Sequence, residues 1–209
     1  MSATPTDGAT PLDPDESEGL IPTHVTTREQ LNRLEQENIV EAMQWLKLAR
    51  PKEILDETFI RKLHHRMFGR VWKWAGKFRT SDKNIGIAKE RIGVELRKLC
   101  ADTKAQIEHA SYPPDEIACR FHHRLVWIHP FPNGNGRHAR LITDLLLEKL
   151  LRRPRFSWGG MSGTSEGDIR AGYLAALRGG QGGLQQTRRI CPETLNNAQP
   201  WAPRSTKRP

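Results

Sequence analysis

The sequence predicts an all-α domain that carries one small β-hairpin. Most of the chain between residues 26 and 151 has apolar residues at helical spacing, and proline or glycine separates these stretches. Only residues 71–87 show the alternation expected of a short strand pair. A chain of 209 residues has room for one such domain with a tail at each end.

Residues 1–20 are rich in Pro, Thr, Asp, Gly and Glu, so we expect a disordered acidic leader there. The domain is expected over residues 21–185. Its first helix is predicted from a cap at Thr26 or Thr27, with Glu29 and Gln30 completing a capping box, to Arg50 before Pro51. The apolar stripe of this helix consists of Leu31, Leu34, Ala42, Trp45 and Leu46.

A second helix is predicted to begin after Asp56 and to bury Phe59, Ile60, Leu63 and Met67. Within it, His64 and His65 are adjacent and therefore point in different directions. We expect one of them buried and one exposed, rather than a metal-binding pair. The hairpin follows over residues 71–87, and Trp72 and Trp74 are expected in the core.

Further helices are predicted over residues 90–110, 115–128, 137–151 and 168–178. From residue 186 the content of Gly, Gln, Pro and basic residues predicts a weakly ordered basic tail to residue 209. No apolar run is long enough to cross a bilayer, and the N-terminus lacks the basic start and apolar core of a signal peptide. The three cysteines are widely spaced, which fits a reducing compartment, so we expect a cytoplasmic protein.

The formal net charge is +9 and the sequence pI is about 9.8, values that favour anionic ligands. The charge is spread along the chain, without zinc-finger spacing or a basic helix with interleaved aromatic residues. Nucleic-acid binding is therefore not expected as the main role. Three histidines near residue 125 also lack a carboxylate or cysteine at a spacing typical of zinc sites: His122, His123 and His129.

The stretch His-Pro-Phe-Pro-Asn-Gly-Asn-Gly-Arg-His-Ala-Arg, residues 129–140, carries most of the chemistry. Its prolines and glycines predict a tight loop that opens a helix, and such a loop leaves backbone N–H groups available to phosphate. Arg137 and Arg140 are three positions apart in the first helical turn, so they either share an anion or face water. His129 is either a proton acceptor beside a bound phosphate or a helix C-cap residue, and its position does not separate these alternatives.

Residues 129–140 resemble the signature of the Fic family, His-x-Phe-x-(Asp/Glu)-Gly-Asn-Gly-Arg-x-x-Arg, at eleven of its twelve positions. The resemblance extends from about residue 24 to residue 185 and implies a Fic-type helical bundle that uses ATP and Mg²⁺. The implied reaction transfers AMP from ATP to a hydroxyl group of a target protein. The implied site consists of His129 as base, Gly134, Asn135, Gly136 and Arg137 around the phosphates, and Arg140 at the γ-phosphate.

One position departs from the signature. Asn133 stands where the family has a carboxylate that holds Mg²⁺. An amide oxygen can still ligate this cation, but without the negative charge that strengthens the bond. Asn133 is therefore a candidate metal ligand of reduced strength.

Many Fic proteins carry an inhibitory helix with the pattern (Ser/Thr)-x-x-x-Glu-(Gly/Asn), whose glutamate pairs with the second arginine of the signature. Glu37 and Asn38 resemble the end of this pattern, although Arg33 replaces the hydroxyl residue. Glu37 is thus either an inhibitory glutamate that would pair with Arg140 or a solvated helical residue. The match at 162–167, which contains Glu166, is interpreted as chance because its glycines indicate a loop.

The hairpin also resembles the Fic flap, which implies that an unidentified target protein docks on residues 76–88 by strand addition. The helix that precedes the domain makes the layout similar to the bacterial subgroup named mobile mystery protein B. Two alternatives to AMP transfer stay open: a Fic-like transferase of another phosphate-containing group, and a nucleotide-binding regulatory partner of a DNA-binding protein. Gly136 favours AMP transfer, because relatives that transfer phosphate have lysine there. The target and the oligomeric state are not specified by the sequence.

Overall fold

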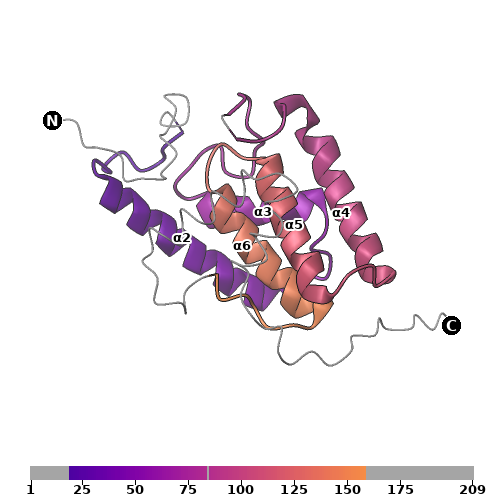
Figure 1. Cartoon of the computed structure of the whole chain (residues 1–209). Helices are drawn as coiled ribbons and strands as arrows, with labels where there is room; N and C mark the ends of the chain where they lie inside the picture. Colours follow the sequence, from indigo (N-terminus) through magenta and orange to yellow (C-terminus); the bar gives the residue numbers. More distant parts are fainter. Residues whose placement is uncertain (1–18, 84, 159–209) are drawn as a thin grey trace.

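The computed structural model describes residues 19–83 and 85–158. The α-helices within these ranges are α2 (Arg28–Ala49), α3 (Glu57–Phe68), α4 (Ile92–Glu108), α5 (Pro114–Ile128) and α6 (Asn135–Leu146). A 3-10 turn, η1 (Lys89–Arg91), precedes α4, and a π-turn, η2 (Leu147–Leu151), follows α6. Helices α5 and α6 pack together between α2 and α4, while α3 contacts α2, α4 and α6 (Figure 1). The mostly helical architecture is confirmed.

The helix starts follow the capping chemistry that the sequence predicts. The Thr27 hydroxyl accepts a hydrogen bond from the Gln30 N–H at 3.2 Å, and the Gln30 side chain accepts one from the Thr27 N–H at 3.3 Å. The Asp56 carboxylate accepts from the N–H groups of Thr58 and Phe59. These bonds satisfy donors that a helix leaves unpaired at its N-terminus, so both starts are set by local sequence.

The core forms where the apolar faces of these helices meet. The four predicted α3 residues are buried, and so are Trp72 and His64, whereas His65 is exposed and Trp74 is half-buried. An antiparallel bridge between Leu20 and Trp72 attaches the start of the described chain to the segment after α3. None of the described helices is long and apolar enough to cross a membrane.

The predicted β-hairpin is not present in the described part of residues 71–88. Arg79 provides the physical reason. Its guanidinium donates to the carbonyl groups of Ser81 and Ile87, so a side chain joins the two sides of the segment in place of a backbone ladder. The predicted helix 168–178, Glu166 and the basic tail lie outside the described residues.

Three fully buried histidines make the fold sensitive to acid. Burial lowers the pKa of His122 to about 3 and that of His138 to about 4, and it also lowers the pKa of His64 well below its ordinary value. Because these rings are neutral in the native state and take up protons on unfolding below about pH 6.5, their stabilising effect is lost as pH falls. Burial raises the pKa of the Asp144 carboxyl to about 6, which acts in the opposite direction and offsets part of the loss.

We therefore expect the free energy of unfolding to fall as pH is lowered from about 7 to about 5, by up to about 1.4 kcal/mol per pH unit for each histidine. Urea unfolding at a series of pH values measures this slope. His138→Gln should flatten it, whereas the same change at the exposed His109 should not. An unchanged slope in His138→Gln would contradict the assignment.

Candidate active site

The side chain of Asn135 fixes the conformation of the loop between α5 and α6. Phe131 is fully buried, and the Asn135 side chain both accepts from the Phe131 N–H at 3.0 Å and donates to the Phe131 carbonyl at 2.8 Å. Asn135 therefore braces the loop. One amide N–H and the amide oxygen of Asn135 thus bind the backbone of Phe131.

The start of α6 is open to an anion. Gly134 is the N-cap residue with φ of 75°, and no side chain caps the helix. A Cβ at Gly134 would lie 2.7 Å from the Phe68 ring, so only glycine fits this turn. Because the first N–H groups of a helix lack partners within it, those of Asn135 to Arg137 are available to an anionic ligand. The helix begins two residues earlier than predicted because Gly134 adopts the left-handed turn.

His129 is the C-cap residue of α5. Its N–H donates to the Leu125 carbonyl at 3.2 Å, and its φ of 52° turns the chain out of the helix. Burial lowers the pKa of His129 to about 4, and the positive charge of Arg79 adds to the fall. The Val126 backbone carbonyl opposes this effect, and Lys83 contributes slightly. The imidazole is therefore unprotonated at neutral pH.

Arg137 is held in place by a residue that the sequence analysis did not single out. Its guanidinium donates to the Glu35 carboxylate at 2.7 Å and lies 4.9 Å from the centre of the Phe68 ring. Glu35 is buried on α2 and also accepts from the Trp72 indole N–H at 2.6 Å. The signal was present in the sequence, because Glu35 is four residues after Leu31 and so shares the buried face of the helix.

The predicted inhibitory contact between Glu37 and Arg140 is not formed. Glu37 is exposed and pairs with Arg33 at 3.1 Å, one helical turn away. Asn38 is buried, donates to the Arg66 carbonyl and accepts from the Arg70 N–H, so it fastens α2 to the end of α3. Arg140 is exposed and makes no hydrogen bond or ion pair with the other described residues.

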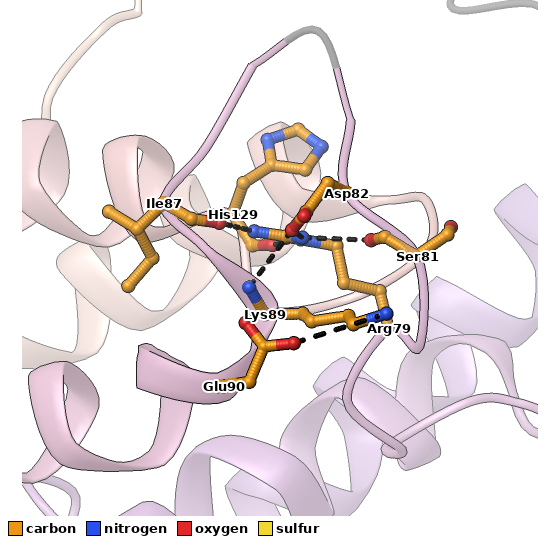
Figure 2. A network of polar contacts seen from close by, with 7 residues as sticks. All are labelled: Arg79, Ser81, Asp82, Ile87, Lys89, Glu90 and His129. Atoms are coloured by element: carbon orange, nitrogen blue, oxygen red, sulfur yellow. Dashed lines mark hydrogen bonds and ion pairs between the residues drawn. The ribbon is translucent and has the colours of Figure 1, made fainter.

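A buried arginine connects the segment 77–88 to the loop (Figure 2). The Arg79 Nε donates to the His129 carbonyl at 2.8 Å, and the Arg79 N–H donates to the Pro130 carbonyl at 3.0 Å. The remaining guanidinium nitrogens bind Ser81, Asp82 and Ile87. The contact between Arg79 and His129 was not predicted from the sequence.

The residues present do not by themselves form a Mg²⁺ site. Within residues 19–83 and 85–158, no three or more His, Cys, Asp or Glu side chains gather around a point where a metal could bind. The Asn133 amide oxygen accepts from the Gly134 N–H at 2.6 Å, so it would have to leave this bond to reach a cation. A magnesium ion here would depend on the phosphates that accompany it.

These features define a mostly helical domain in which a loop with an uncapped helix start is flanked by a neutral histidine and two arginines. The comparison with known proteins gives a family whose model matches part of the chain. Residues 54–147 match the model of the Fic/DOC family.

The relatives show how far the likeness extends. The protein adenylyltransferase fic-1 of Caenorhabditis briggsae is 33% identical over 93 residues, which cover 42% of this chain and 18% of the relative. The N-terminal Fic domain of a Bartonella sp. AR 15-3 effector superposes with a TM-score of 0.64 at 18% identity, over 80% of this chain and 83% of that domain. A Bartonella quintana Fic domain with bound ADP has a TM-score of 0.63 at 16% identity, over 81% and 86% of the two chains. The chain thus spans about a fifth of the curated relative.

The contrast between Glu35 and Glu37 can be measured on one helix. Glu35→Ala leaves the buried Trp72 indole and the Arg137 guanidinium without their acceptor, so we expect it to lower the free energy of unfolding by about 2–4 kcal/mol. Glu37→Ala removes only an exposed pair and should cost less than about 0.5 kcal/mol. Urea unfolding of both variants makes the comparison. Equal losses would contradict the role assigned to Glu35.

Proposed function

We propose that the chain is a protein adenylyltransferase, which moves AMP from ATP to a hydroxyl group of a target protein. The observation that carries this proposal is the uncapped start of α6 beside a neutral His129. The name of the curated relative and the ADP bound to the Bartonella quintana domain support it.

The phosphates of ATP would lie against the first turn of α6. The backbone N–H groups of Gly136 and Arg137 supply donors there, and the dipole of the helix favours negative charge. Arg137 is already oriented by Glu35, so it binds phosphate with little loss of side-chain entropy. Arg140 is exposed and has no hydrogen-bond partner among the described residues, which suits it to the γ-phosphate.

His129 would act as the general base. The hydroxyl oxygen of the target attacks the α-phosphorus of ATP, and the bond from this phosphorus to the oxygen that leads to the β-phosphate breaks. Pyrophosphate leaves with that bonding pair, and the hydroxyl proton moves to the imidazole of His129. The target would dock on residues 76–88, which Arg79 holds against the His129 backbone.

Mg²⁺ would accompany ATP and neutralise phosphate charge. Asn133 is the residue that would contact it, through the amide oxygen that now accepts from Gly134.

Removal of the base tests the reaction. With α-labelled ATP and Mg²⁺ or Mn²⁺, the wild type should label itself or a protein of its host extract. His129→Ala should reduce labelling at least about 100-fold, because general-base catalysis contributes at least that factor. His109→Ala, at an exposed histidine far from the loop in sequence, is the matched control.

The same experiment with γ-labelled ATP separates the alternatives. Label transferred from the γ-phosphate would show that the chain transfers phosphate and not AMP. Calorimetric binding of ATP without label from either position would favour the nucleotide-binding regulatory partner.

The lowered pKa of His129 predicts the acid limit of the reaction. Because the base must be unprotonated, kcat/KM should stay constant from about pH 8 to about pH 5 and fall only toward the pKa of about 4. An inflection near pH 6.5, the ordinary value for histidine, would contradict the burial of the ring. Tryptophan fluorescence at each pH verifies that the protein is still folded.

A further inference from the structure

His64 on α3 uses both nitrogens of its ring inside the core. The ring is fully buried, and the Gly76 N–H donates to its Nδ1 at 3.0 Å. A nitrogen that accepts a hydrogen bond carries no proton, so the single proton of the neutral ring is on Nε2. That atom donates to the Asn133 carbonyl at 3.0 Å. The two bonds together determine the tautomer.

The two hydrogen-bond partners of His64 lie in two separate turns, one at the start of the segment 76–88 and one at the start of α6. Gly76 has φ of 77° and opens the segment 76–88, and a Cβ there would lie 2.8 Å from the Arg61 carbonyl. Asn133 immediately precedes Gly134, whose φ of 75° opens α6. Both turns require glycine, and one imidazole joins them across the core.

Packing holds the ring of His64 in a single orientation. It stacks on Phe131 with ring centres 3.8 Å apart and an interplanar angle of 24°. Phe68 and His138 lie 4.8 Å and 5.4 Å away on other sides. Burial lowers the pKa of His64 well below its ordinary value, and His138 adds to the effect, so Nδ1 remains an acceptor near neutral pH.

We propose that His64 is a positioning residue, which sets the phosphate loop through the Asn133 carbonyl and the target-binding segment through the Gly76 N–H. The proposal rests on the proposed adenylyl transfer. His64 touches neither ATP nor the target hydroxyl, and it acts by fixing the backbone that does.

Two substitutions separate the halves of this bridge. The amide of glutamine reaches the position of the ring Nε2, so His64→Gln keeps a donor for Asn133 and loses the acceptor for Gly76. The amide of asparagine lies near the position of Nδ1, so His64→Asn keeps the acceptor for Gly76 and loses the donor for Asn133. His109→Gln and His109→Asn, at an exposed site, are the matched controls.

The two variants should fail in opposite ways. His64→Asn should weaken ATP binding about tenfold and shift the amide resonances of residues 134–136, because a buried carbonyl loses its partner. His64→Gln should keep ATP affinity within about threefold, but it should speed hydrogen exchange of the Gly76 amide at least about tenfold. In transfer assays, His64→Asn should raise KM for ATP, and His64→Gln should lower kcat with little change in that KM.

Equal effects of both variants on both readouts, or no effect of either, would overturn the proposal and leave His64 as packing only. If neither variant folds, a scalar coupling between the Gly76 amide nitrogen and His64 Nδ1 in the wild type decides the question, and its absence overturns the proposal. Amide exchange and the resonances of residues 134–136 need no nucleotide. A failure of ATP binding by the wild type would therefore count against the adenylyltransferase proposal and not against the bridge.

Discussion

A buried guanidinium is the constraint on which the site depends. Arg79 is only 3% exposed, and a charge removed from water is costly unless its donors find acceptors. Three guanidinium nitrogens meet this requirement with carbonyl groups of Ser81, Ile87 and His129, and Asp82 adds a single carboxylate (Figure 2). The segment 81–87 must therefore close around Arg79, and the backbone of the base is fixed by the same side chain.

This arrangement links the place where a target would dock to the residue that would accept its proton. Gly86 packs so closely that a Cβ there would lie 2.9 Å from the Cβ of His129. The positive charge of Arg79 also helps to lower the pKa of the imidazole. Burial is the main cause of the lowered pKa of His129, and Arg79 adds to it while it binds the His129 carbonyl.

Helix α2 adds a second constraint, from outside the segment that matches the family. Residues 54–147 contain the loop and both arginines, yet Arg137 is oriented by Glu35 of α2. Glu35 also accepts from Trp72, whose backbone pairs with Leu20. The N-terminal part of the described chain therefore contacts the first turn of α6 through one carboxylate. Its exposed neighbour Glu37 has no part in this contact.

The sequence alone determined the described α-helices to within a few residues and the caps of α2 and α3, because these depend on contacts within a few residues. Thr27 and Gln30, Asp56, and the glycines of the loop are local features of this kind. The tertiary structure decided which polar side chains meet across the core. Glu35 and Arg137 are 102 positions apart, His64 and Asn133 are 69 apart, and neither pairing follows from periodicity. Residues 71–87 were predicted as a hairpin because alternation indicates strands. In the structure the buried Arg79 side chain makes the bonds that a backbone ladder would have made, and sequence patterns do not report such contacts.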